Sequence, residues 1–251
     1  MIFPIIEPNW SVGQKIQALT STRQGGVSLP PYASFNLADH VEDQPEAVAH
    51  NRAILQQAFA ADLKWAWLNQ QHTTHVVHFN QACLQPCVAD AVWSDQPNQV
   101  CAVMTADCLP ILLTNQAASL VAAVHAGWRG LADGIIAKTL ETLPEQPQNL
   151  IAWIGPAISQ AVFEVGEEVV DAFLAQSPSL SRFFVENPAA PSKFFADLPG
   201  IAQDQLQHLG VDRVSLSGRC SYGDATDFFS YRRDGQTGRM VSAIWLKDTS
   251  N

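Results

Sequence analysis

Residues 100–130 read VCAVMTADCLPILLTNQAASLVAAVHAGWRG and contain three apolar runs separated by short segments with polar residues. Its first two apolar runs, 100–105 and 109–114, have the composition of buried strands. Pro110 has no backbone N–H to donate to a ladder, so a break or bulge is expected at Cys108.

A third apolar run, 119–125, predicts another buried strand, which ends at His125. The glycine-flanked turn 126–130 follows, and apolar residues from Leu131 to Leu143 then recur at helical spacing. A strand end, a turn and a helix start therefore lie within a dozen or so residues, as they often do around a binding site.

Residues 43–60 predict a helix. Asp43 and Glu46 match a capping box and Pro45 suits an early helical position. At helical spacing Arg52 falls on the side expected to face the protein, where a cation needs an anionic partner.

The other patterns alternate strands and helices without strict βαβ order. We therefore expect an α+β fold with mixed β-sheets, in a single domain over residues 1–251. Further strands are predicted at 150–154, 213–216, 228–232 and 240–246, and helices at 167–176 and 198–209.

Composition narrows the classes of function. The 251 residues are 47% hydrophobic and carry a net charge of −10, so they lack the basic field that a nucleic-acid polymer or an anionic membrane surface requires. The five cysteines are an odd number in a chain too large to need disulfide staples. Without a signal-like N-terminus or a long apolar span, we expect a cytoplasmic protein that binds a small molecule, as a monomer or small homo-oligomer.

Three candidate metal ligands follow apolar runs: His72, Cys108 and His125. Two imidazoles and a thiolate with no obvious fourth partner are typical of a catalytic zinc site that keeps one position for water. The spacing matches no short metal motif, so separate core roles for these side chains remain an alternative. In another interpretation Cys108 is a nucleophile and His125 its base, oriented by Asp107 or Asn115.

A local group, His72, His75, His78, Cys83 and Cys87, is a weaker candidate for a second metal site. In an extended chain His75 would point away from His72 and His78. Solvated histidines and ordinary buried thiols are the simpler interpretation.

Arginines near glycine turns are candidates for binding an anion. Arg23 lies in the turn Arg23-Gln-Gly-Gly26, and Arg129 lies in Gly127-Trp-Arg-Gly130 at a predicted helix start. A solvent-exposed arginine explains the second position equally well. Trp128 is the tryptophan best placed to stack on a ligand.

Nine short motifs are distributed along the chain: STRQGGVS (21–28), YASFNL (32–37), QH (71–72), TADCLP (105–110), HAGWRG (125–130), GP (155–156), FEVG (163–166), FSYRRD (229–234) and TGR (237–239). Taken together, these motifs resemble the YfiH-type laccase-domain family, also called the polyphenol oxidase or multicopper-type family. The resemblance covers about residues 20–246.

The resemblance implies a single α+β domain with mixed sheets packed between helices, related to toxin deamidases with a Cys-His pair. It also implies one metal, usually zinc, held by His72, Cys108 and His125. Thr73 departs from the family, which commonly has Gly after this histidine, and this leaves substrate preference open.

Members of this family are described as purine nucleoside phosphorylases that accept adenosine, inosine, guanosine or methylthioadenosine and that also deaminate adenosine. An open zinc site suits attack on C6 of adenine. We expect Cys108, His125 and Asp107 to act in catalysis, Arg52 to bind phosphate with help from Arg23 or Arg129, and Asn36 and Gln71 to contact substrate.

Two other activities attached to the family stay open. One is copper-dependent polyphenol oxidation, although the chain has only seven histidines for several copper centres. The other is a Cys-His hydrolase that edits peptidoglycan precursors.

Overall fold

The computed structural model describes residues 3–79 and 87–248, and most of its strands form two large mixed sheets. The five-stranded sheet has the order β1-β2-β16-β8-β3, and the six-stranded sheet has the order β15-β11-β9-β10-β7-β5. The pairs β3–β8, β11–β15 and β5–β7 are parallel, and the other neighbours in these sheets are antiparallel. The strands of the five-stranded sheet are β1 (Ile5–Ile6), β2 (Ile16–Ser21), β3 (Lys64–Ala66), β8 (Gln99–Thr105) and β16 (Met240–Leu246). Those of the six-stranded sheet are β5 (Val76–His78), β7 (Ala91–Ser94), β9 (Leu109–Asn115), β10 (Val121–Ala126), β11 (Leu150–Ile154) and β15 (Arg213–Leu216).

Two smaller sheets and the helices complete the fold. The smaller sheets pair β4 (Leu68–Asn69) with β6 (Cys87–Val88), and β14 (Lys193–Ala196) with both β12 (Glu164–Gly166) and β13 (Phe184–Glu186). The α-helices are α1 (Pro45–Gln57), α2 (Trp128–Ala132), α3 (Ile135–Thr142), α4 (Glu167–Leu174), α5 (Leu198–His208) and α6 (Tyr231–Asp234). Short 3-10 turns lie at Pro147–Asn149, Gln160–Val162 and Pro178–Phe183.

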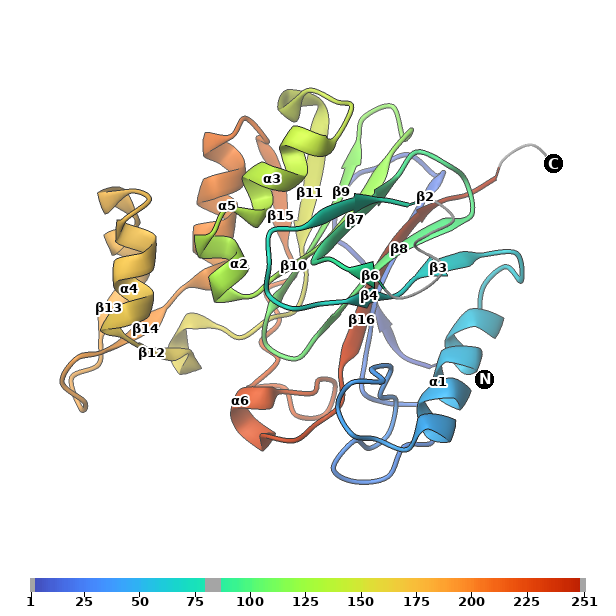
Figure 1. Ribbon diagram of the computed structural model, residues 1–251, viewed down its shortest axis with the longest axis horizontal. Coiled ribbons are helices and arrows are strands. Elements are labelled where there is room, and N and C mark those ends of the chain that lie inside the picture. Colours follow the sequence, from blue (N-terminus) through green and yellow to red (C-terminus); the bar gives the residue numbers. More distant parts are fainter. Residues whose placement is uncertain (1–2, 80–86, 249–251) are drawn as a thin grey trace.

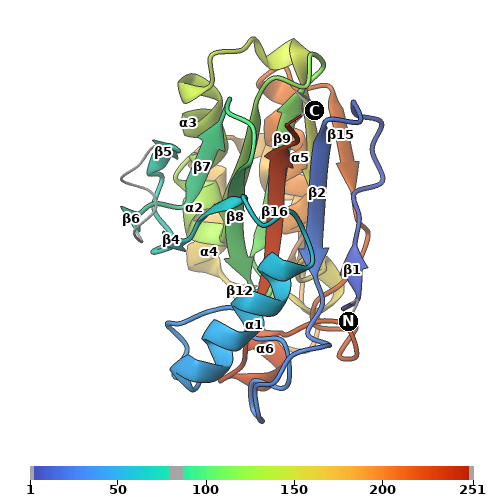
Figure 2. The ribbon, with the colours of Figure 1, turned by 90° about the vertical axis from the view of Figure 1, so that its right-hand side faces the viewer.

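Apolar side chains on both faces of each large sheet build a layered molecule. Between the sheets, Cys101, Val103 and Ile244 of one pack with Leu112 and Trp153 of the other. The outer face of the six-stranded sheet packs against α2, α3 and α5, and the outer face of the five-stranded sheet packs against α1 (Figures 1 and 2). The predicted class, mixed sheets between helices, is therefore confirmed.

The predicted break at Cys108 is a change of sheet. β8 ends at Thr105 and pairs with β16 and β3, whereas β9 begins at Leu109 and pairs with β10 and β11. Asp107, in the connection, has a φ of +94°. Cys108 therefore lies where the chain crosses from one sheet to the other.

Three local predictions need correction. The strand expected at 228–232 is absent, because Ser230 accepts a hydrogen bond from the N–H of Arg233 and caps α6. The helix expected from Leu131 to Leu143 is divided at Gly134, which has a φ of +90°. The capping box at α1 does not form, since the Asp43 carboxylate binds the N–H of Gln44 and two side chains of the preceding loop.

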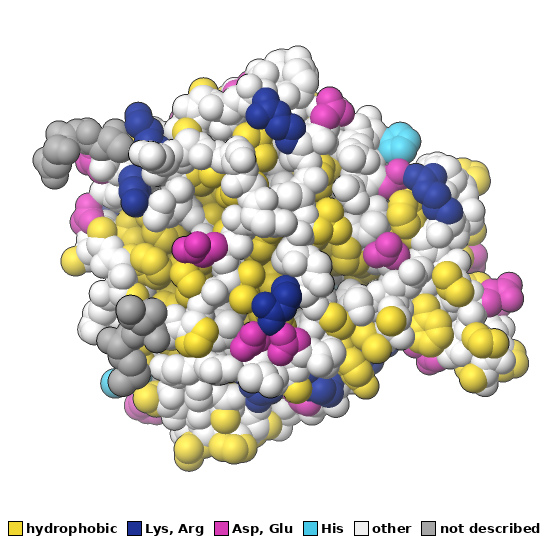
Figure 3. Space-filling model, turned by 180° about the vertical axis from the view of Figure 1, so that it is seen from behind, with side chains coloured by type: hydrophobic (Ala, Val, Ile, Leu, Met, Phe, Trp, Pro, Cys, Tyr) yellow, Lys and Arg dark blue, Asp and Glu magenta, His cyan; other side chains and the backbone are white. Residues whose placement is uncertain are grey.

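The face shown in Figure 3 carries Lys and Arg side chains interspersed with acidic and hydrophobic ones. No helix in the described part of the chain combines the length and the apolar character needed to cross a bilayer.

Candidate metal centre

His72, Cys108 and His125 converge at one end of the sheets. Antiparallel pairing sets His125 opposite Pro110 and Ala126 opposite Leu109, so His125 lies beside the turn that carries Cys108. His72 follows β4 and has a φ of +58°, which turns the chain towards the same point. The strand ends therefore bring together three candidate ligands that are distant in sequence.

The three side chains have the geometry of a metal site. One ligand atom from each lies within 4.8 Å of the others, and Cys108 Sγ is 3.7 Å from His72 Nε2. Zn–S and Zn–N bonds of about 2.3 and 2.0 Å at a tetrahedral angle put the two donors about 3.6 Å apart. The donor set therefore fits a single tetrahedral metal such as zinc with a fourth position open.

Asp90 holds two of these ligands in place. It is fully buried, and its Oδ1 lies 2.7 Å from Nδ1 of His125 and accepts the backbone N–H of His72. Its Oδ2 accepts bonds from the N–H and the hydroxyl of Thr73. With Nδ1 occupied, His125 turns its other nitrogen to the centre, as metal-binding histidines commonly do.

The electrostatics favour an anionic sulfur. Burial raises the pKa of the Cys108 thiol, but the charge and hydrogen bonds of His125 and His72 outweigh burial and lower the pKa to about 6. Burial lowers the pKa of His125, but the Cys108 thiolate and Asp90 outweigh burial and raise it to about 9. Both shifts favour a thiolate on Cys108 and an imidazolium on His125 in the metal-free centre.

The centre opens into a cleft of about 430 Å³, within the usual range of small-molecule sites. Around the ligands the wall is both polar and aromatic: His40, Gln70, Met104, Thr105, Ala106, Trp128, Arg129, Tyr231 and Arg239. A smaller, mainly apolar recess of about 130 Å³ shares Cys108, Trp128 and Tyr231 with it and reaches Phe163. The cleft thus joins a metal centre to surfaces that suit a flat heterocycle.

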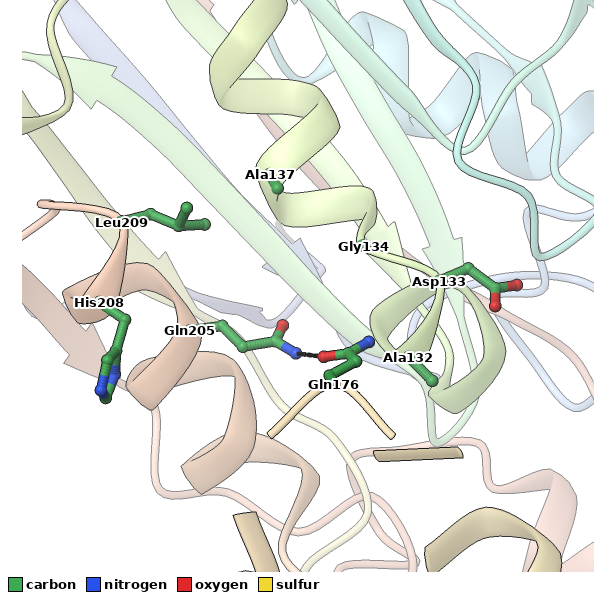
Figure 4. A pocket seen from close by; sticks show the side chains of 8 residues that line it. All are labelled: Ala132, Asp133, Gly134, Ala137, Gln176, Gln205, His208 and Leu209. Atoms are coloured by element: carbon green, nitrogen blue, oxygen red, sulfur yellow. Dashed lines mark hydrogen bonds between the residues drawn. The ribbon is translucent and has the colours of Figure 1, made fainter. Parts of the chain in front are cut away.

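A second pocket, about 410 Å³, lies between α2, α3 and α5 (Figure 4). Gln205 donates a 2.9 Å hydrogen bond to Gln176 across it. Its titratable side chains, Asp133 and His208, lie at opposite sides in Figure 4. The ionisable side chains that lie close together therefore line the cleft at His72, Cys108 and His125 and not this pocket.

The structure gives Asp107 and Asn36 supporting contacts. Asp107 is buried, and its carboxylate accepts bonds from the Ser221 hydroxyl and the backbone N–H of Arg232. Asn36 is fully buried, and its Oδ1 accepts the N–H of Arg239. Asn36 therefore braces the cleft wall from behind, whereas Asp107 lines the smaller recess while its carboxylate is held by these two bonds.

The predicted arginines are placed differently from one another. Arg23 donates to the carbonyls of Ala33 and Ala225. Arg52 donates to the carbonyl of Leu37, approaches Asp39 at 3.3 Å and stacks on Trp67, in a pocket that shares only His40 with the cleft. Of the arginines selected from sequence, Arg129 lines the cleft, where it is exposed and stacks on Trp128.

The remaining predicted residues do not join the centre. Gln71 is exposed and donates its backbone N–H to Asp90. Asn115 binds Ser119 and Glu145 at the far end of β9. His78 stacks on Trp93, and Cys83 lies outside the described residues, so the second metal site has no support in the part that is described.

Comparison with known proteins now decides the family. The family described as multi-copper polyphenol oxidoreductase laccase matches residues 17–247. The chain belongs to this family. The resemblance found in its motifs is therefore confirmed.

Relatives of this laccase-like family align over nearly their whole length. A purine nucleoside phosphorylase of Haemophilus influenzae is 44% identical over 96% of this chain and 99% of its own. The purine nucleoside phosphorylase YfiH of Escherichia coli K12 is 44% identical over 96% of this chain and 98% of its own.

Solved structures of the family have the same fold. A Neisseria meningitidis protein superposes with a TM-score of 0.92 at 44% identity, covering 97% of this chain and 99% of its own. The YfiH protein of Bacillus licheniformis has a TM-score of 0.87 at 28% identity, covering 92% and 93%.

Two functional candidates were missed by sequence reasoning. Asp90 lies in the run Val88-Ala-Asp-Ala-Val92, and an acid inside an apolar run of the sequence was the available signal. Arg239 lies in a recognised motif, but nothing local indicated that it faces the cleft.

Proposed function

We propose that this protein is a zinc-dependent purine nucleoside phosphorylase that also deaminates adenosine. The observation that carries the proposal is the His72–Cys108–His125 triad, oriented by Asp90, in a cleft with aromatic walls. The names of the relatives add the substrate class. Adenosine, inosine, guanosine and methylthioadenosine are the proposed nucleosides.

The chain's own side chains position the substrate. Trp128 and Tyr231 offer aromatic faces on which a purine stacks, and the apolar recess towards Phe163 excludes water from one end. Gln70 is held rigidly, because its amide exchanges two hydrogen bonds with the backbone of Met104. In this proposal the aromatic faces and the recess orient the base, and Gln70 keeps the β8 side of the cleft wall in place.

A bound zinc ion would supply Lewis-acid polarisation of a substrate atom or of water. Asp90 fixes the tautomer and direction of His125, and Gly127 leaves room for the His72 ring. The Asp107 carboxylate, which was expected to act in catalysis, holds the Cys108 turn against α6.

The test combines metal content with base release. Protein purified without added metal is analysed by mass spectrometry, and the same sample is assayed for hypoxanthine and adenine from inosine and adenosine, with and without phosphate. We expect stoichiometric zinc and phosphate-dependent release in the wild type, and loss of both in Cys108→Ala but not in Cys220→Ala. Conversion of adenosine to inosine without phosphate measures the proposed deaminase activity. Zinc without base release contradicts the proposal, as does bound copper with oxygen consumption on a phenol.

One observation favours a second candidate, a metal-free Cys-His hydrolase. The Cys108 thiolate and the His125 imidazolium form the kind of pair that such enzymes use. This candidate predicts that alkylation of Cys108 inactivates an enzyme that contains no metal, whereas the phosphorylase loses activity on metal removal alone.

A further inference from the structure

Phosphorolysis requires a cation for phosphate, and Arg239 is placed for this task. It directly precedes β16, whose Met240 pairs with Thr105, so Arg239 stands beside the end of β8. It lines the cleft together with Cys108 and His125, and its guanidinium carbon is 5.8 Å from the Tyr231 ring. Its cationic group therefore lies beside Tyr231 in the cleft that contains the metal centre.

The guanidinium is anchored on one side and available on the other. Nη1 donates to the carbonyls of Thr237 and Gly238, at 2.8 and 3.0 Å. Nε and Nη2 make no hydrogen bond to any of the residues that the structure describes, and they are not among the buried polar atoms without partners. These nitrogens are therefore open to the cleft, in the fork geometry that binds phosphate oxygens.

The backbone of Arg239 is held rigidly. Its N–H donates to Asn36 Oδ1 at 3.0 Å, and Asn51 donates to the carbonyl of Asn36 at 2.8 Å. Asn36 and Asn51 are fully buried. Little conformational entropy is lost when such an arginine binds an anion.

A second, independent observation is the hydroxyl of Thr105. Thr105 lines the same cleft and is 1% exposed, yet its Oγ1 has no hydrogen-bond partner in the described structure. A buried polar group without a partner costs about 1–3 kcal/mol, so an acceptor oxygen at this point would be stabilising. Arg239 and Thr105 thus present complementary donors next to the metal centre.

We propose that Arg239 and Thr105 form the phosphate subsite of the cleft. The proposal rests on the proposed phosphorylase function. An oxygen of HPO₄²⁻ forms the bond to C1′ while the C1′–N9 bond breaks, its electron pair leaves with the base, and the phosphate proton ends on that base. Arg239 holds the nucleophile as an ion pair, and Thr105 donates to one of its oxygens. Arg52 then has a structural role on Leu37 and Asp39.

The test measures inorganic phosphate directly and kinetically. Binding of phosphate to the metal-loaded protein is measured by calorimetry, and KM is determined separately for phosphate and for inosine. In Arg239→Gln we expect phosphate affinity to fall and KM for phosphate to rise at least tenfold, with KM for inosine within twofold. Arg239→Lys should restore part of the affinity, and Thr105→Val, which preserves side-chain shape, should raise KM for phosphate several-fold. Arg213→Gln, at an exposed position of β15, is the matched control.

The outcomes separate the two proposals. Suppose that the wild type binds phosphate but releases no base, and that Arg239→Gln no longer binds phosphate. This result supports the subsite and overturns the phosphorylase. Unchanged phosphate affinity in both Arg239→Gln and Thr105→Val overturns the subsite, as does a wild type that binds no phosphate. If KM for phosphate rises in Arg52→Gln and in neither Arg239→Gln nor Thr105→Val, Arg52 is the residue that binds phosphate. Circular dichroism of each variant establishes that it is folded.

Discussion

Nδ1 of His125 lies 2.7 Å from a carboxylate oxygen of Asp90, and the same carboxylate accepts the backbone N–H of His72. One buried acid therefore orients the imidazole of His125 and anchors the backbone of His72. Burial raises the pKa of Asp90, but the hydrogen bonds from His125 and Thr73 outweigh it and lower the pKa to about 2. The carboxylate therefore stays ionised over the whole neutral range.

Asp90→Asn tests this relationship. An amide nitrogen would face either His125 or the donors of Thr73, so one of these contacts is lost. We expect zinc affinity to fall about 10–100-fold and the free energy of unfolding to fall by about 1–3 kcal/mol, measured by chelator competition and urea denaturation. The control is Asp95→Asn, which removes an exposed carboxylate near His78. Unchanged zinc affinity in Asp90→Asn would contradict the positioning role.

Removing the metal should expose a reactive thiolate. Because His125 and His72 lower the pKa of Cys108 to about 6, the metal-free chain should be alkylated by iodoacetamide at pH 7. As pH falls below 6 the thiol is protonated and the reaction slows. Mass spectrometry should place the label on Cys108, and added zinc should protect it. Labelling that begins only above pH 8 is the contrary result.

The strands could be predicted where apolar runs have clear ends. The ranges 150–154, 213–216 and 240–246 match β11, β15 and β16, and the break at Cys108 followed from Pro110. The strand predicted at 228–232 is wrong, because the Ser230 side chain caps a helix there. An apolar sequence predicts that residues are buried but not which conformation they adopt. Here the hydrogen bond from the N–H of Arg233 to the Ser230 hydroxyl favours the helix.

The site was predictable only in part. Ligands at strand ends could be proposed from sequence, since strand ends commonly open into sites. Asp90 and Arg239 act through contacts with residues far away in the chain, and no local pattern encodes such contacts. Asn36 was expected to touch substrate, whereas its burial places it behind Arg239.

Asn36→Ala distinguishes these two roles. The change leaves the N–H groups of Ala38 and Arg239 without their acceptor in a buried region. We expect the free energy of unfolding to fall by about 2–4 kcal/mol, with KM for phosphate rising and KM for inosine unchanged. Asn69→Ala, at an exposed position, is the control. Unchanged stability with a higher KM for inosine would instead support the prediction that Asn36 contacts the substrate.

Gly127→Ala should impair the metal centre without touching a ligand. A Cβ at Gly127 would lie 2.5 Å from Cδ2 of His72 and 3.1 Å from Sγ of Cys108, so the imidazole must move. The φ of Gly127 is −67°, which alanine adopts without strain, and α2 should therefore still form. We expect at least tenfold weaker zinc binding, with a stability loss of about 1–3 kcal/mol from overpacking. Gly223→Ala is the matched control, because its Cβ would meet Cys220 only at an ordinary 3.7 Å. Wild-type zinc affinity in Gly127→Ala would mean that the His72 ring does not need the space above Gly127, and that the ligand geometry described for the triad is incorrect.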